Sequence, residues 1–278
     1  MRIRSIFLLV AALLAAFAAP ASAQWLAPAD VVVTPRGNGP INPDRAAAEA
    51  AYGAASDPAR QAALAANLDR WREMPAQLGQ RHLWVNVPAQ EVVLVEYGRA
   101  VGRWNVIVGR PTTPTVSFST EVTGVNLNPW WYVPQSIVRE SIGALVRNRP
   151  AEARRRGYVV SNGSYRQRPG PGNALGRMKL VMPNNHAIYL HDTPSRHLFD
   201  RENRTFSHGC IRVEDAMGFA ATLLGLERQE LEAMAADGRT QTVNLAEPIP
   251  VHITYFTAVE GQGGEAELLD DIYGRDRG

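Results

Sequence analysis

The stretch FSHGCIR, residues 206–212, holds the single cysteine of this 278-residue chain, Cys210. One cysteine cannot close a disulfide within its own chain, so the thiol is a buried small side chain, a link to another molecule or a working nucleophile. A nucleophilic thiol needs a base, a group that orients the base, and donors for a developing oxyanion. The residues alone support a nucleophile and an inert thiol about equally.

Six histidines are candidate bases, and His191 fits best. It ends an apolar run, AIYLH, that is typical of a strand, and the Asp-Thr-Pro that follows predicts a turn. His208 lies only two residues from the thiol, and such near neighbours seldom reach base geometry, so we expect it to hold the loop or a substrate group. We expect His82 and His252 to be structural. We expect His186 and His197 to be exposed to solvent.

The residues that flank the thiol predict its other partners. Gly209 has no Cβ and permits close approach of a substrate, so the amides of Gly209 and Cys210 are candidate oxyanion donors. A helix that begins near Val213 would bring its positive end to the thiolate. Arg212 can pair with a substrate carboxylate through two parallel hydrogen bonds.

The same side chains are also ligand types for zinc. His191, His208 and Cys210 could together supply two imidazoles and a thiolate. The paired spacings typical of zinc sites, such as C-x-x-C and H-E-x-x-H, are absent from the sequence. The spacing therefore gives a metal site little support.

The sequence around these residues predicts a mainly β domain of the α+β class at residues 81–257. Three Val-rich runs in LWVNVPAQEVVLVEYGRAVGRWNVIVG predict a meander, and PIPVHITYFTAV predicts a closing strand. VEDAMGFAATLLGL and RQELEAMAADG predict two helices after the cysteine. We expect the Arg-rich residues 147–173 to form a cap-like insertion. This segment contains a run of basic residues that could bind an anionic polymer. The favoured alternative is that the run is a face exposed to solvent. The run consists of Arg147, Arg149, Arg154, Arg155 and Arg156.

The remaining segments flank this domain. Residues 1–23 combine the basic MRIR, an apolar stretch and Ala-Ser-Ala, which is the layout of a secretory signal peptide. Residues 24–44 predict a flexible leader, 45–80 a helical arm broken near Ser-Asp-Pro at 56–58, and 258–278 a polar tail. The chain has 29 basic and 27 acidic residues, so loss of Arg2 and Arg4 with the signal leaves 27 of each. That neutral balance does not indicate a nucleic-acid partner, and no later segment predicts a membrane span.

The stretch IYLHDTPSRHLFDRENRTFSHGCIRVEDA resembles the active-site signature of the L,D-transpeptidases, the YkuD-domain family. That signature is a histidine, a loop, then Ser-His-Gly-Cys and an Arg or Asn. It is matched by His191, Ser207, His208, Gly209, Cys210 and Arg212. The likeness extends over about residues 64–256, through LDRWREMP, WVNVPAQEVVLVEYG, VIVGRPTTPT and NPWWYVPQSIV. It is greatest to the larger periplasmic branch, and we expect this chain to lack that branch's peptidoglycan-binding module.

The resemblance implies a YkuD-like mixed β-sandwich or barrel and a reaction in the periplasm. Cys210 would attack the diaminopimelate carbonyl of a peptidoglycan tetrapeptide stem, His191 would take the thiol proton, and a carbonyl at or beside Asp192 would orient the imidazole. D-Alanine would leave, and an amine of a second stem would resolve the thioester into a 3-3 cross-link. No metal or organic cofactor is implied, and β-lactams of the carbapenem type are implied inhibitors.

Secondary site predictions and alternatives stay open at this point. Tyr189 should share a strand face with His191, and Ser207 is predicted to shape the loop. The aromatic run Trp130, Trp131 and Tyr132 is equally consistent with a wall for the stem and with core packing. Two other functions remain: a hydrolase of the same fold that uses water, and a wall-binding scaffold, which would not need the cysteine, histidine and arginine together.

Overall fold

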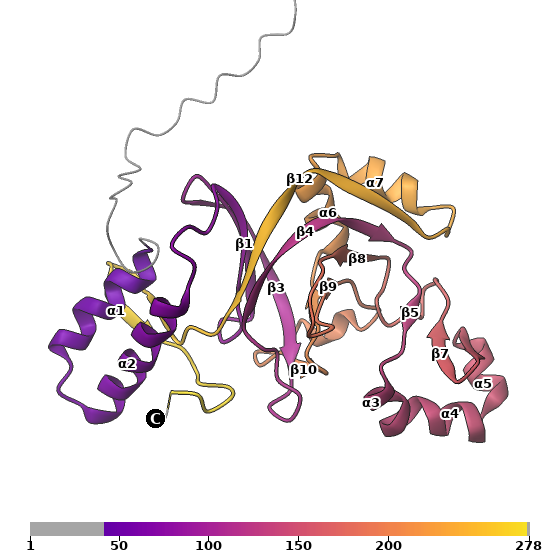
Figure 1. The fold of residues 1–278 in the computed structure, drawn as a ribbon, viewed down its shortest axis with the longest axis horizontal. Helices are drawn as coiled ribbons and strands as arrows, with labels where there is room; N and C mark the ends of the chain where they lie inside the picture. The colour runs from indigo at the N-terminus through magenta and orange to yellow at the C-terminus, as the bar shows by residue number, and fades with distance from the viewer. Residues whose placement is uncertain (1–41, 277–278) are drawn as a thin grey trace, which may run out of the picture. The chain divides into compact units, whose positions relative to one another are not determined.

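The chain folds as the α+β protein that the sequence predicts, with most of its regular structure in strands (Figure 1). A computed structural model describes residues 42–276. The predicted signal peptide and nearly all of the predicted leader lie outside these residues. A nine-stranded mixed sheet has the order β10-β3-β11-β9-β8-β4-β12-β1-β2. Its strands are β1 (Arg81–Asn86), β2 (Glu91–Glu96), β3 (Arg99–Gly109), β4 (Phe118–Leu127), β8 (Met178–Val181), β9 (Leu190–His191), β10 (Thr205–Ser207), β11 (Ile211–Val213) and β12 (Gln241–Thr254).

The sheet closes on itself through the long strand β3. Its first half pairs antiparallel with β2, and Val106 and Ile107 in its second half pair with β11. The predicted meander is confirmed, because β1, β2 and β3 are joined by antiparallel pairing. Closure leaves an interior filled by alternate strand residues, among them Leu83, Val108 and Leu180, each fully buried.

The helix α6 (Ala216–Leu224) packs into this core. Six of its residues are buried, including Phe219 and Leu223. Asp215 caps its start by accepting from the amide of Gly218, and Gly225 ends it at φ 66°, the left-handed conformation that glycine adopts without strain. The predicted helix is confirmed, but it begins at Ala216 and not at Val213. Strand β11 lies between the cysteine and α6, so the positive helix end is not beside the thiol. A second helix follows as α7 (Arg228–Ala235).

Two N-terminal helices lie beside β1 and the end of β12 (Figure 1). They are α1 (Pro43–Ala54) and α2 (Pro58–Glu73), separated by Asp57, whose carboxylate accepts from the amide of Arg60. Trp71 of α2, Trp84 of β1 and Phe256 stack against one another, and the Trp71 ring centroid lies 5.5 and 4.1 Å from those of Trp84 and Phe256. This apolar stack fixes α2 against the sheet.

A separate group of small elements, which we call the side lobe, spans residues 131–167. It contains α3 (Gln135–Ile137), the π-helical turn η1 (Val138–Ile142), α4 (Gly143–Asn148), α5 (Pro150–Arg155), and a sheet of β5 (Trp131–Tyr132), β7 (Ser164–Gln167) and β6 (Tyr158–Ser161). Its basic run is exposed, and Arg149 and Arg156 both pair with Glu152. This exposure agrees with the favoured prediction that the basic run is a face exposed to solvent.

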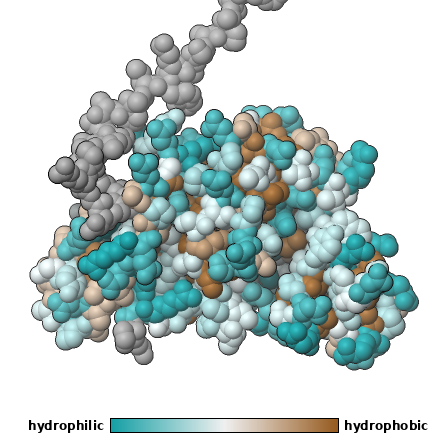
Figure 2. Space-filling view, in the orientation of Figure 1, coloured by the Kyte–Doolittle hydropathy of each residue, from teal (hydrophilic) through white to brown (hydrophobic). Residues whose placement is uncertain are grey.

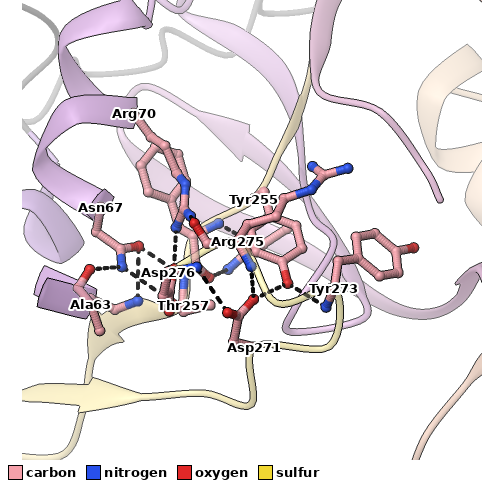
Figure 3. A network of polar contacts seen from close by, with 12 residues as sticks. Ala63, Asn67, Arg70, Tyr255, Thr257, Asp271, Tyr273, Arg275 and Asp276 are labelled. Carbon is pink, nitrogen blue, oxygen red and sulfur yellow. Dashed lines mark hydrogen bonds and ion pairs between the residues drawn. The ribbon is translucent and has the colours of Figure 1, made fainter. Parts of the chain in front are cut away.

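The C-terminal segment is not the tail that its polar composition predicted. It forms the hairpin of β13 (Ala258–Glu260) and β14 (Ala266–Leu268), and residues 269–276 then fold back onto α2 (Figure 3). Asp276 pairs with Arg70 at 2.7 Å, and Asp271 accepts from Tyr255 at 2.5 Å. Polar residues here bond to protein instead of water, which composition alone does not reveal.

The face drawn in Figure 2 is mixed in character. Hydrophilic residues dominate it, and apolar ones reach it in small separated groups, chiefly in the upper middle where β12 and β4 cross in Figure 1. Within residues 42–276, no helix has the length and apolar character needed to cross a membrane.

Asn67 of α2 joins the helical arm to the C-terminal hairpin, and its loss should be costly. It is fully buried, and its side-chain oxygen accepts from the amides of Thr257 and Ala258 at 2.9 and 3.0 Å. We expect Asn67→Ala to lower the free energy of unfolding by about 3 kcal/mol, because two buried amides lose their acceptor. Urea unfolding measures this. The exposed Asn185→Ala serves as the matched control, with a change below about 0.5 kcal/mol; equal effects would contradict the assigned role of Asn67.

Candidate active site

Three neighbouring strands carry polar residues side by side. Lys179 of β8 pairs with His191 of β9, and His191 pairs with Arg212 of β11. Directly paired residues project from the same face of a sheet, so the three side chains form one row. Cys210 immediately precedes β11 and therefore enters the site at the end of that strand.

His191 is buried and held in one tautomer. Its Nδ1–H donates to the backbone carbonyl of Asp192 at 2.5 Å, which leaves Nε2 as the acceptor nitrogen. The pKa of His191 is lowered to about 3, chiefly by burial and also by the charges of Arg212 and Lys179, while the hydrogen bond to Asp192 opposes the shift. The imidazole is therefore neutral at physiological pH, as a proton acceptor must be.

The side chain of Asp192 fixes the carbonyl that orients His191. This carboxylate is buried, accepts from the amides of Arg177 and Thr193 at 2.8 and 2.7 Å, and pairs with Arg196 at 2.6 Å. Gly176 leaves the space it needs, because a Cβ there would stand 2.3 Å from a carboxylate oxygen. The sequence predicted the carbonyl but not the carboxylate behind it, whose anchors are distant or main-chain groups.

The Cys210 thiol is partly exposed at the residue level, but its sulfur lies in a poorly solvated position. Burial raises the pKa of the thiol, while a backbone hydrogen bond from Tyr189 and the charges of Arg212 and Lys179 oppose the rise. The sulfur also lies 3.5 Å from the carbonyl oxygen of Ala187. Tyr189 thus reaches the site through its main chain as well as its ring.

The loop before the cysteine is shaped by Ser207, as predicted. Its buried hydroxyl donates to the carbonyl of Cys210 at 2.5 Å and accepts from the amide of Gly209 at 3.0 Å. Ser207 thus engages the amide of Gly209 in this structure, and the role of that amide as an oxyanion donor stays a prediction. Gly209 has a φ of 109°, which explains the glycine by backbone conformation. Within the described residues, the amide of Cys210 has no such partner and remains a candidate donor.

A buried threonine ties this loop to the barrel and to the C-terminal segment. The hydroxyl of Thr115 donates to the carbonyl of Gly209 and accepts from the amide of Gly109, both at 2.9 Å. The Tyr273 hydroxyl donates to the carbonyl of Gly109 at 2.7 Å and accepts from the amide of Thr115 at 3.2 Å. Tyr273 stacks on Tyr255, seen in Figure 3, so the C-terminal segment supports the loop that carries the thiol.

His208 turns toward the side lobe. Its Nε2 lies 2.7 Å from a carboxylate oxygen of Glu140 in η1 and 2.8 Å from a guanidinium nitrogen of Arg110. The supporting role predicted for His208 agrees with this contact. In the part of the chain that the structure describes, no three His, Cys, Asp or Glu side chains gather as they would around a metal ion. The conceivable zinc set of His191, His208 and Cys210 is therefore not assembled.

Of the two tryptophans proposed as a wall for the substrate, Trp131 lies in strand β5 of the side lobe and Trp130 directly precedes that strand. Arg166 lies over the Trp130 ring at 5.3 Å from its centroid, and Trp131 packs near Tyr158 at 6.4 Å. Both side chains are partly exposed, and the choice between a wall for the stem and core packing stays open.

Sequence reasoning missed Lys179, whose ammonium lies 4.2 Å from the centroid of the Tyr189 ring. A signal was present: the chain contains 28 arginines and this one lysine. Thr115 and Tyr273 were also missed, and for them no signal exists, because their partners come from segments far apart along the chain.

These observations agree with a comparison of the sequence with known families. The model of the L,D-transpeptidase catalytic domain, YkuD, matches residues 80–249. That match covers more than half of the chain, and the chain therefore belongs to the L,D-transpeptidase family.

Individual relatives are more distant. A Haemophilus influenzae protein named "Putative L,D-transpeptidase" is 30% identical over 237 residues, which are 77% of this chain and 48% of the relative. The chain thus spans about half the length of that curated relative. Solved structures include an L,D-transpeptidase from Mycobacterium smegmatis, with 11% identity, coverage of 63% and 58% of the two chains and a TM-score of 0.35. L,D-transpeptidase 3 from Mycobacterium tuberculosis, in complex with a faropenem-derived adduct, has 14% identity, coverage of 63% and 60%, and a TM-score of 0.35. Scores this low carry no argument, so the family match stands on sequence.

The buried imidazole should make stability depend on pH. Folding lowers the pKa of His191 from 6.5 to about 3, so the stability it contributes is complete above pH 6.5 and is lost as the pH falls toward 3. Burial lowers the pKa of His82 and His252 in the same direction. We expect His191→Gln to make the free energy of unfolding depend less steeply on pH between 6.5 and 3 than it does in the wild type.

Urea unfolding at a series of pH values measures that dependence. The exposed His197→Gln is the matched control and should keep the wild-type slope. A wild-type slope in His191→Gln as well would contradict the buried, neutral state assigned to this imidazole.

Proposed function

We propose that this chain is a periplasmic cysteine L,D-transpeptidase that forms 3-3 cross-links between peptidoglycan stem peptides. The observation that carries the proposal is the state of His191. Its Nδ1–H is tied to the Asp192 carbonyl, which leaves Nε2 as the acceptor nitrogen, and its strand pairs with β11, which Cys210 immediately precedes. A neutral base of fixed tautomer, on the strand next to the one that follows the thiol, supports acyl transfer by cysteine. Membership of the family supports the substrate class.

The resting site is uncharged at the reacting atoms. Burial raises the pKa of the thiol and lowers that of the imidazole, so thiol and neutral imidazole coexist before substrate binds. Nε2 of His191 therefore takes the proton as the sulfur attacks, and the developing thiolate accepts the hydrogen bond from the amide of Tyr189. The free amide of Cys210 donates to the oxygen of the tetrahedral intermediate.

The remaining steps return the proton and exchange the acyl group. The carbon–nitrogen bond to D-alanine breaks, the imidazolium protonates the leaving amine, and the stem is left as a thioester on Cys210. An amine of a second stem then attacks the thioester carbonyl, His191 accepts its proton, and the new amide forms as the sulfur leaves. Sulfur regains the proton from the imidazole. Water in place of the amine would give hydrolysis instead.

The location follows from the N-terminal sequence. Residues 1–23 have the basic, apolar and small-residue layout of a signal peptide, which supports export to the compartment where stem peptides are cross-linked. A thiol that must stay reactive in an oxidising compartment is compatible with a chain that has no other cysteine to trap it.

Acylation by a carbapenem tests the nucleophile. We expect incubation of the mature protein with meropenem to add one β-lactam mass, because the sulfur opens the strained ring as it would attack the stem carbonyl. Intact-mass spectrometry measures the adduct. Cys210→Ala should give none, and Cys210→Ser with an unchanged far-ultraviolet spectrum serves as the folded control. An adduct on Cys210→Ala would assign the nucleophile to another residue.

The products distinguish transfer from hydrolysis. With purified tetrapeptide muropeptides we expect a cross-linked dimer and free D-alanine, separated by chromatography and identified by mass. The rate should fall at least about a thousandfold in His191→Gln, in which Nε2 no longer accepts the thiol proton. Monomeric tripeptide as the sole product would instead support the peptidase alternative.

A further inference from the structure

Lys179 is the only lysine in the chain, and it lies in the same site as the only cysteine. All 28 other basic side chains are arginines. Lys179 stands next to His191 in the row of paired strand residues, with Arg212 on the other side of the imidazole. The reaction described above uses neither cation at a reacting atom, which leaves their presence unexplained.

Neither cation has an acidic partner in the protein. Lys179 lies over the ring of Tyr189, and the group whose charge acts on it is the sulfur of Cys210. The same sulfur acts on Arg212, and no Asp or Glu within residues 42–276 forms an ion pair with either residue. Arginines elsewhere at this edge are paired, as Arg196 is with Asp192 at 2.6 Å.

Two unpaired cations in a poorly solvated site call for an anion. Burial lowers the pKa of Lys179 and of Arg212, which expresses the cost of keeping their charges from water. A thiolate at Cys210 would balance one positive charge at most, and the raised pKa of the thiol makes even that charge transient. An anion from outside the chain therefore completes the site.

We propose that Lys179 and Arg212 form a carboxylate-binding pair that recognises the free α-carboxylate of the residue leaving the substrate. Both cations act on the sulfur, so a carboxylate held between them lies close to the carbonyl under attack. The residue released from the end of a peptide carries its carboxylate at that distance from the broken bond. Arg212 offers a planar fork, and Lys179 a compact charge with three rotatable donors that fits the remaining space.

The anion site itself does not depend on the proposed function, and two small reagents test it directly. Iodoacetate and iodoacetamide both alkylate a thiolate, but only iodoacetate carries a carboxylate. Their rate ratio cancels the fraction of thiolate and reports the local field. We expect Lys179→Met to lower the iodoacetate-to-iodoacetamide ratio at Cys210 roughly fivefold. Lys179→Arg should stay within about twofold of the wild type, and the exposed Arg154→Met should leave the ratio unchanged.

A measurement on wild-type protein guards against a variant that fails to fold. Acetylation of the folded chain neutralises its only ε-amine, and Lys179→Arg treated in the same way corrects for the α-amine. Acetylation should lower the ratio in the wild type and not in Lys179→Arg. An unchanged ratio in both Lys179→Met and acetylated wild type would overturn the proposal.

Peptide donors test the ligand class, and this part rests on the proposed function. Donors ending in a free carboxylate should be preferred over the same donors ending in an amide, and Lys179→Met should reduce that preference in kcat/KM by at least about fivefold. If the iodoacetate-to-iodoacetamide ratio falls in Lys179→Met but the wild type turns over no peptide, the anion site is supported and the proposed transpeptidase function is rejected. Turnover with an undiminished carboxylate preference in Lys179→Met would reject the role of the pair and leave the transpeptidase standing.

Discussion

Strand β3 is the constraint on which the site depends, because it pairs along both of its edges. Pairing with β2 and β11 closes the sheet and sets the position of β11 beside β9. A shift of one residue in this register would turn His191 and Arg212 to the opposite face, since strand side chains alternate. The closed ring leaves little freedom for such a shift. The row of Lys179, His191 and Arg212 is thus a consequence of barrel closure, and the loop before β11 places the sulfur at its end.

Electrostatics at the site follow from burial more than from any single charge. Burial lowers the pKa of His191 and raises that of Cys210, which keeps both neutral until a substrate arrives. Lys179 and Arg212 then act in two ways. They disfavour an imidazolium at His191, and they stabilise a thiolate at Cys210 and, in the proposal above, the carboxylate of a substrate. We expect the proton to pass from Cys210 to His191 only when a reacting carbonyl is present. A reactive thiolate is therefore not maintained before substrate binds.

Segments at the two ends of the described chain support the centre. The C-terminal residues join α2 through Asn67 and Arg70, and reach the thiol loop through Tyr273 and Thr115. The link is made of hydrogen bonds between buried groups, which are costly to leave unsatisfied. On the opposite side of the loop, His208 meets Glu140 of the side lobe. The loop that carries Cys210 is therefore held from the barrel, the C-terminal segment and the lobe at once.

The sequence by itself determined the α+β class, the meander, α6 and α7, and the break between α1 and α2, because these features depend on local periodicity and capping. It also singled out Cys210 and His191 by residue type and by a signature of adjacent residues. Only the tertiary structure decided the rest. Ser207 accepts from the amide of Gly209, the polar C-terminal segment folds onto α2, and Trp131 belongs to the side lobe. Each depends on partners brought together from distant parts of the chain, and a linear pattern carries no information about that pairing. Lys179 depends on both sources of information. The sequence shows that it is the only lysine, and the register of β8 and β9 places it beside His191.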